Sequence, residues 1–175
     1  MTIDEKLLAD DASARAMALD IGRSFIVQAP AGSGKTELLI QRYLTLLANV
    51  EHPEEVLAIT FTRKAAAEMQ MRVLEALQRA VKGEEPEAQH ERITAAAALA
   101  VLERDRALGW NLVAHPRRLR IQTLDSLNAM IARARPLTAS GGAAGNTIIA
   151  DAEMRALYRG AAALTFDQLT EEDDL

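Results

Sequence analysis

The sequence predicts an α/β fold in which a parallel β-sheet is covered by helices. Three short apolar runs of strand character, at residues 24–27, 54–60 and 119–123, are each followed by a longer segment with helical spacing. The run at 54–60 is nearly continuous in apolar residues, which is typical of a parallel strand buried on both faces. Because parallel strands are joined by crossover connections, this alternation of strands and helices favours a parallel sheet.

Helical spacing is clearest directly after the first apolar run. From Lys35 to Asn49, leucine, isoleucine and tyrosine recur as they would on one face of an α-helix. Polar loops are expected at residues 83–89 and 140–146. The other helices are expected within the first 20 residues and at residues 63–81, 91–108, 127–134 and 153–164.

The composition is that of about one globular domain. The 175 residues are 49% hydrophobic and 26% charged, which is ordinary for a protein of this length. The sequence has no apolar run of about 18 residues, which a transmembrane helix would need. The acidic start MTIDEK is not that of a signal peptide. We therefore expect a cytoplasmic protein without membrane contact.

Charge and residue types narrow the function further. The chain has no cysteine, which excludes disulfides and thiolate metal sites, and its three histidines lack the spacing of metal ligands. The formal net charge of −5 argues against a simple basic DNA-binding module, because phosphate contacts normally give such modules a net positive charge. A motor enzyme remains compatible, because only the charge that lines its groove matters.

The strongest functional signal is the segment APAGSGKT at residues 29–36. It follows the P-loop pattern, with Ala29 in place of the first glycine. A turn with few side chains lets backbone N–H groups point into one concavity and hold phosphate oxygens, and the following helix adds its positive N-terminal end. The expected nucleotide-binding residues are Ala31, Gly32, Ser33, Gly34, Lys35 and Thr36.

Two residues of this loop are expected to act through their side chains. Lys35 can reach the β- and γ-phosphates, and the Thr36 hydroxyl can ligate Mg²⁺. ATP and Mg²⁺ are therefore the expected cofactors, and these two residues are the expected catalytic-site residues. The alternative is a glycine-rich turn that only caps a helix. The strand expected before the loop and the amphipathic helix expected after it favour the ATP site.

The second apolar run continues into ITFTRKAAAEM at residues 59–69. Together with SFIVQAPAGSGKTELL at residues 24–39, it resembles superfamily 1 DNA helicases of the UvrD/RecB type, and among them the RecB/AddA-like helicase–nuclease branch. In that family the segment is motif Ia, and the resemblance implies that the path of single-stranded DNA is lined by Phe61, Thr62, Arg63 and Lys64. An aromatic ring can stack on any base, and basic or hydroxyl groups can hold phosphates. Without the resemblance, Phe61 would be interpreted as core and the two basic residues as a solvated helix start.

A third segment, LRIQTLDSL at residues 119–127, resembles the family's next DNA-contacting segment. The resemblance makes Thr123 and Ser126 candidate DNA contacts. The histidine that usually follows the threonine by two residues is Asp125 in this chain, and its carboxylate would repel phosphate. Asp125 is therefore expected to cap the following helix. The basic cluster at residues 117–120 is open to two interpretations, a DNA contact or a solvated approach to the strand.

The resemblance also implies a fold and a domain plan. The fold would be a RecA-like P-loop NTPase, a three-layer sandwich with a parallel sheet and helical insertions. Residues 1–135 would form an incomplete ATP-binding domain, 1A, interrupted by a helical insert at about residues 71–115. Residues 136–175 would begin a helical insertion domain, 1B. Many relatives read adenine with a glutamine upstream of the P-loop, and residues 11–20 contain none.

Family members need further parts that the sequence does not show: an acidic motif for Mg²⁺, an arginine finger and a second RecA-like domain. The run at residues 147–153 superficially resembles the acidic motif, but Ala152 separates its acids, and Asp151 is expected to be a helix N-cap. We therefore expect the N-terminal part of a longer helicase. Its partners would be single-stranded DNA, the remainder of the helicase with the second RecA-like domain, and a nuclease subunit or domain. By itself the chain is expected to bind ATP without turnover.

Two other functions remain open on the sequence alone. A non-catalytic nucleotide-binding module that acts through protein contacts would also lack the acidic motif. A small P-loop kinase would need an arginine-rich lid over its acceptor substrate, which the alanine-rich segment at residues 91–108 does not resemble. The sequence favours an ATP-dependent DNA helicase, and a role in repair or recombination is implied by the family only.

Overall fold

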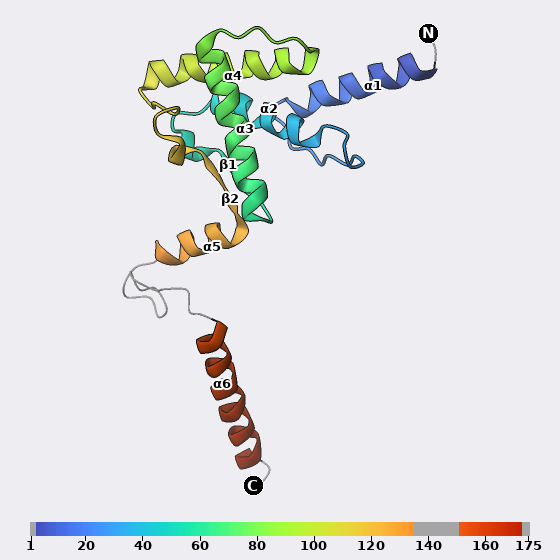
Figure 1. Ribbon diagram of the computed structural model, residues 1–175. Helices are drawn as coiled ribbons and strands as arrows, with labels where there is room; N and C mark the ends of the chain where they lie inside the picture. Colours follow the sequence, from blue (N-terminus) through green and yellow to red (C-terminus); the bar gives the residue numbers. More distant parts are fainter. Residues whose placement is uncertain (1–2, 135–150, 173–175) are drawn as a thin grey trace. The chain divides into compact units, whose positions relative to one another are not determined.

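A computed structural model describes residues 3–134 and 151–172 of the chain. The chain divides into two units, residues 1–128 and 129–175, and each is described by itself. The elements in Figure 1 are α1 (Ile3–Ala18), α2 (Lys35–Leu47), η1 (Pro53–Glu55), β1 (Leu57–Thr60), α3 (Arg63–Lys82), α4 (Gln89–Leu108), η2 (Pro116–Arg118), β2 (Arg120–Thr123), α5 (Leu124–Arg133) and α6 (Asp151–Glu172).

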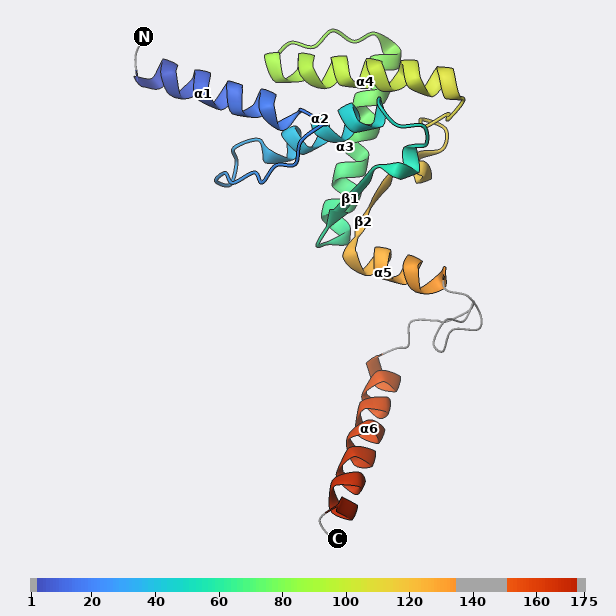
Figure 2. The same ribbon diagram turned by 180° about the vertical axis from the view of Figure 1, so that it is seen from behind.

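The sheet of the first unit has two parallel strands. Leu57 of β1 lies beside Arg120 of β2, and Thr60 lies beside Thr123 at the other end. In sequence α3 and α4 connect the two strands, and α3 packs against both of them, as Figures 1 and 2 show from opposite sides. The carboxyl ends of β1 and β2 therefore meet at one edge of the sheet.

The predicted strand at residues 24–27 is not formed. Ile26 is 99% exposed, and in the described part of the chain β1 and β2 pair only with each other. A strand needs a neighbouring strand for its backbone hydrogen bonds, so an apolar run without such a neighbour stays outside the sheet. The strand expected at 54–60 is also shorter, because Pro53–Glu55 form the 3₁₀ helix η1. The α/β class is thus confirmed in a coarser form: a mostly helical structure with a two-stranded parallel sheet.

The predicted helices are present wherever the structure describes the chain. The helix expected at 127–134 begins earlier, at Leu124, and the helix expected at 153–164 extends over Asp151–Glu172. Asp151 is the first residue of α6. The loop expected at 140–146 and the apolar run at 147–150 lie outside the described residues.

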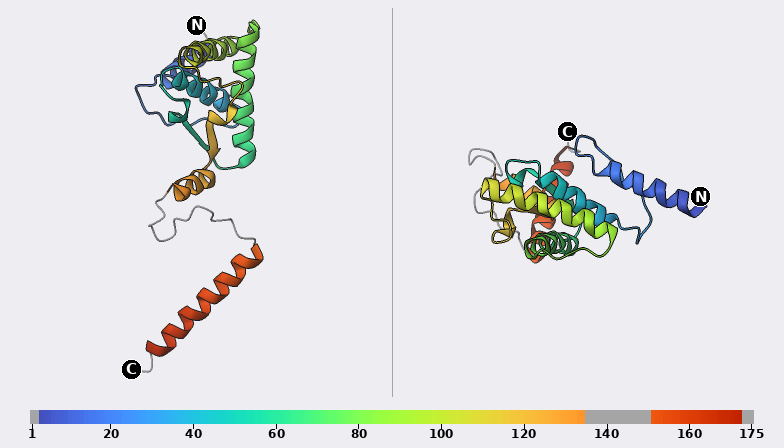
Figure 3. Two further views of the ribbon diagram at one scale, coloured as in Figure 1. Left: turned by 90° about the vertical axis from the view of Figure 1, so that its left-hand side faces the viewer. Right: turned by 90° about the horizontal axis from the view of Figure 1, so that it is seen from above.

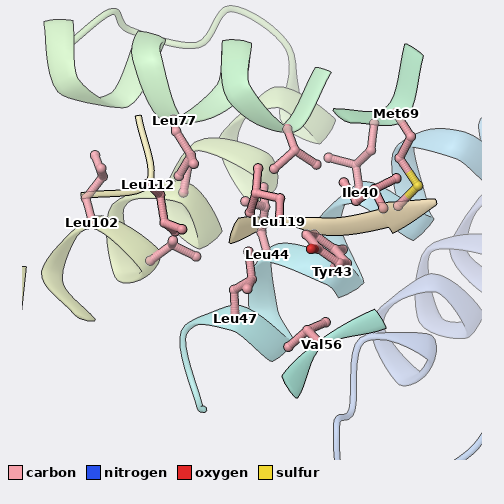
Figure 4. Close-up of a cluster of buried hydrophobic side chains, with 14 of the residues drawn as sticks. Ile40, Tyr43, Leu44, Leu47, Val56, Met69, Leu77, Leu102, Leu112 and Leu119 are labelled. Carbon is pink, nitrogen blue, oxygen red and sulfur yellow. The ribbon is translucent and has the colours of Figure 1, made fainter. Parts of the chain in front are cut away.

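The core of the first unit forms where α2, α3, α4 and β2 meet. Its fully buried side chains include Leu44 and Leu47 of α2, Val73 and Leu77 of α3, Val101 of α4, and Leu112. Figure 4 shows Leu44, Leu77 and Leu112 in this cluster, and Figure 3 shows α4 lying against α2 and α3. Burial also raises the pKa of the Tyr43 phenol in this cluster, because the phenolate ion would lose its hydration. The helix that follows the glycine-rich loop is therefore anchored in the core along one face.

Two polar contacts tie the connection between α4 and β2 to the turn before β1. The buried Trp110 donates from Nε1 to the Glu51 carbonyl at 3.0 Å. Arg118 binds both carboxylate oxygens of Glu54, at 2.7 and 3.2 Å, and these hydrogen bonds hold the pKa of Glu54 below its ordinary value. The two interpretations of the cluster at residues 117–120 were a DNA contact and a solvated approach to the strand. Arg118 fits neither of them, because its guanidinium is paired with Glu54. It stabilises the approach to the sheet.

The second unit contains α6, whose described side chains, those of residues 151–165, are exposed. Leu157 and Tyr158 are among them. No helix within residues 3–134 and 151–172 combines the length and the apolar content that crossing a bilayer requires.

Candidate functional site

The glycine-rich segment before α2 forms a loop whose backbone only glycine adopts easily. Gly32 and Gly34 both have a φ of +78°, in the left-handed region where a β-carbon is strained. A β-carbon on Gly32 would meet no atom within 4 Å, so open space lies beside this position. Gly34 is the N-cap of α2, and no side chain caps this helix end. Within the described part of the chain, no side chain accepts a hydrogen bond from the first N–H groups of α2.

Lys35 and Ser33 extend the polar lining of the loop. The Lys35 ammonium donates to the carbonyl oxygens of Ala29, at 2.7 Å, and Pro30. Because an ammonium has three donors, one N–H remains for an anion. The Ser33 Oγ is buried and has no hydrogen-bond partner among the described residues, and the Thr36 side chain is exposed. The loop therefore offers unused donors around an open space, which suits a phosphate group.

Two arginines that the sequence did not single out hold this loop and the segment that precedes it: Arg15 contacts the loop, and Arg42 contacts residues 18–23. Arg15 of α1 donates to the Ser33 carbonyl at 2.6 Å and pairs with Asp11 at 2.7 Å. Arg42 of α2 donates to the carbonyls of Ala18, Asp20 and Arg23, at 2.6, 3.0 and 2.8 Å. The only sequence signal was the i, i+4 spacing of the Asp11–Arg15 pair, which predicts an ion pair on a helix but no contact with a loop.

A pocket of about 280 Å³ adjoins the loop between α1 and residues 25–29. Its lining is mostly apolar, with Met17, Phe25 and Val27 among the contributors, and Arg15 and Lys35 add charge. The Phe25 ring also lies 5.4 Å from the Arg42 guanidinium. The segment at 24–27, although it is not a strand, is therefore fixed in place by a side chain of α2.

A second group of predicted site residues lies at the carboxyl edge of the sheet. Phe61 is 95% exposed, and Arg63 and Lys64 are exposed in the first turn of α3. That turn has no acidic residue, so the two basic side chains and the positive helix end reinforce each other. The pairing of Thr60 with Thr123 brings the start of α5 next to this group.

The threonines of this edge cap helices. The Thr62 Oγ1 accepts from the Ala65 amide at 3.1 Å. Thr123 is buried, its Oγ1 accepts from the Ser126 amide at 3.2 Å, and the two hydroxyls lie 2.9 Å apart. The prediction that Asp125 caps α5 is therefore wrong, because Thr123 makes the capping contact from the end of β2. Of the pair, Ser126 is exposed and Thr123 is not.

A glycine-rich loop that opens a helix is the part of the P-loop pattern that the structure forms, whereas the strand expected before the loop is not formed. Residues 10–173 match the family model described as UvrD/REP helicase N-terminal domain. The chain therefore belongs to the UvrD/REP helicase N-terminal domain family.

Curated relatives of the chain are much longer proteins. It is 46% identical over 74 residues to the A subunit of the ATP-dependent helicase/nuclease of Bacillus cereus (strain AH820) and to that of Bacillus anthracis, which covers 41% of this chain and 6% of each relative. The protein of the same description from Bacillus cytotoxicus is 46% identical over 72 residues, covering 39% of this chain and 6% of the relative. No solved structure matches the chain.

Proposed function

We propose that this chain is the ATP-binding N-terminal part of an ATP-dependent DNA helicase that acts on single-stranded DNA in repair or recombination. The observation that carries the proposal is the loop at residues 29–36, with its two glycines at positive φ and the uncapped N-terminus of α2. Membership of the UvrD/REP helicase family supports it. The same membership argues against a small kinase.

The nucleotide would be held by the loop residues Ala31, Gly32, Ser33, Gly34, Lys35 and Thr36. Their backbone N–H groups would bind phosphate oxygens. The Lys35 ammonium would bind a phosphate through its remaining N–H, and its positive charge would offset part of the phosphate charge. The exposed Thr36 hydroxyl would be a ligand of Mg²⁺, which screens the phosphates when it is bound. We place no further catalytic group in this chain.

Single-stranded DNA would lie at the carboxyl edge of the sheet. Phe61 offers an exposed ring on which a base can stack, while Arg63 and Lys64 offer charge for phosphates. The Thr62 hydroxyl can still donate a hydrogen bond after capping, since a hydroxyl has both donor and acceptor capacity. The Ser126 hydroxyl can donate to a phosphate when it accepts from the Thr123 hydroxyl. Thr123, which is buried, would act through Ser126.

Turnover would require parts supplied by the remainder of the helicase, including a second RecA-like domain and the Mg²⁺-binding acid. A nuclease subunit or domain is a further proposed partner, because the curated relatives are described as helicase/nuclease subunits. This chain alone is proposed to bind nucleotide without hydrolysing it at an appreciable rate.

Titration calorimetry of the chain with Mg²⁺ and ATP tests the proposal. We expect saturable binding at one site for ATP and ADP and much weaker binding for AMP, because AMP lacks the phosphates that the loop is proposed to hold. Absence of binding by both ATP and ADP, or equal binding of all three nucleotides, would contradict a P-loop site. Rapid hydrolysis stimulated by DNA would contradict the dependence on missing parts.

A double variant with Arg63→Ala and Lys64→Ala tests the DNA contacts. Fluorescence anisotropy with a labelled oligothymidine should show weaker binding, and the dependence of log K on log salt should flatten by about 0.7 for each phosphate that is no longer bound. The matched control is Arg79→Ala with Lys82→Ala, which removes the same charge from the last turn of the same helix. Equal effects of the two double variants would mean that net charge alone drives binding and would exclude a specific path at Arg63 and Lys64.

A further inference from the structure

A small polar network joins the first two turns of α2 to the first two turns of α4. The Thr94 Oγ1 lies 2.5 Å from the Glu37 Oε1 and donates to it. The Gln41 side chain, which is only 5% exposed, donates from Nε2 to the Thr94 Oγ1 and to the His90 carbonyl, both at 3.1 Å. The buried Gln41 amide and the Thr94 hydroxyl thus bind, in series, the carboxylate of Glu37, the residue that directly follows the glycine-rich loop.

The network fixes where the Thr94 proton goes. A threonine hydroxyl has one proton and can accept through its lone pairs. The Gln41 amide occupies the acceptor side, and the His90 carbonyl, at 3.2 Å from Oγ1, is a longer alternative acceptor than Glu37. The Thr94 proton is therefore directed to the Glu37 carboxylate, which is held on the side of α4.

Glu37 occupies a position that matters for the loop. Gly34 is the N-cap of α2, so Glu37 is the third helical residue. A glutamate at this position commonly reaches back and accepts a hydrogen bond from the N-cap amide. In α2 that amide belongs to the loop proposed to hold phosphates. A carboxylate placed there would occupy a phosphate donor and repel the phosphate charge.

We propose that Thr94 is a positioning residue for nucleotide binding: by holding Glu37 toward α4, it keeps the N-terminal amides of α2 available to phosphate. The inference rests on the proposed nucleotide function. The inference assigns a role to α4, which lies in the predicted helical insert: α4 would affect nucleotide binding without contributing a residue to the loop. Thr94 acts through Glu37 and does not itself touch the nucleotide.

The test combines three substitutions with MgATP titration. Thr94→Val removes the hydroxyl at nearly constant shape and should raise the Kd for MgATP by roughly three- to tenfold, while Thr94→Ser should restore it. In the background of Glu37→Ala, Thr94→Val should have no further effect, because no side-chain acceptor remains to reach the N-cap amide. The matched control is Thr45→Val, whose hydroxyl bonds the Gln41 carbonyl within α2 at 2.8 Å and should leave the Kd unchanged. An equal loss in the Glu37→Ala background, or no loss with Thr94→Val, would overturn the proposal.

A measurement without nucleotide separates this inference from the proposed function. In ¹H–¹⁵N spectra the Gly34 amide proton should move downfield in Thr94→Val, as the Glu37 carboxylate reaches it. It should not move in the double variant with Glu37→Ala, which has no side-chain acceptor at this position. If this shift occurs but the wild-type chain binds no MgATP, the nucleotide function fails and the positioning of Glu37 by Thr94 stands. If the wild-type chain binds MgATP and the Gly34 amide does not respond, the positioning role is wrong.

Discussion

Replacing Lys35 with alanine is expected to raise the Kd of the chain for MgATP by roughly ten- to a hundredfold, because a hydrogen bond to a charged group contributes about 1.5–3 kcal/mol. The variant loses the ammonium that is proposed to lie next to the phosphates and also its two contacts to the Ala29 and Pro30 carbonyls. Both effects lower affinity, the first by removing charge and the second by loosening the start of the loop. Calorimetric titration of the variant beside the wild type measures the change.

The matched control for this variant is Lys82→Ala. Lys82 lies in the last turn of α3 and pairs with Glu84 at 3.5 Å on the surface, and exposed pairs of this kind contribute little to stability. Its removal subtracts the same charge from the protein and should leave the Kd for MgATP unchanged. If both lysine variants bound MgATP equally weakly, the effect would come from net charge, and Lys35 would have no special position at the site.

The variant Leu44→Ala is expected to lower the free energy of unfolding by about 2–5 kcal/mol. Leu44 is fully buried in the cluster that α2, α3 and α4 form, so truncating it removes apolar contacts and leaves a cavity. Because a domain of this size is stabilised by only about 5–15 kcal/mol, a substantial part of the stability would disappear. Urea unfolding, followed by far-ultraviolet circular dichroism, measures the change.

Leu39→Ala is the control for this core variant. Leu39 lies on the same helix and is 50% exposed, so the same chemical change should cost less than about 1 kcal/mol. A loss of similar size at both positions would contradict the packing of α2 described above. A small loss at both would mean that the core of the first unit tolerates the cavity by collapsing around it.

The elements predicted well from the sequence are those that depend on local signals. The helical spacing after Lys35 and the Gly34-Lys35-Thr36 signature follow from neighbouring residues, and the structure forms α2 where they indicate it. The register of β1 with β2, by contrast, depends on residues far apart in the chain. The apolar runs predict β1 and β2, but they do not show which runs pair with each other. The run at 24–27 has the same local pattern and no pairing strand, so its prediction as a strand is wrong.

The parts of the candidate site that the sequence could not predict are side-chain contacts over long separations. Arg15, Arg42 and Thr94 carry no motif, and each looks like an ordinary helix residue. Their importance comes from where α1, α2 and α4 bring them, beside the Ser33 carbonyl, the segment before the loop and Glu37. The prediction for Asp125 failed for a different reason. Aspartate is a residue type that favours helix N-caps, but Thr123 at the end of β2 is placed to accept from the Ser126 amide and caps α5 instead.

The pairing of β1 with β2 has a consequence for the order in which the first unit assembles. Because α3 and α4 separate the strands in the chain, the sheet requires the closure of a long loop, whereas α2, α3 and α4 follow one another closely and can collapse together first. During synthesis β1 leaves the ribosome well before β2, so the helical cluster has time to form while β1 waits for its partner. The edge that carries Phe61, Arg63 and Ser126 is therefore the last part of the unit to become complete, and the surface proposed to bind DNA is finished only after β2 has docked.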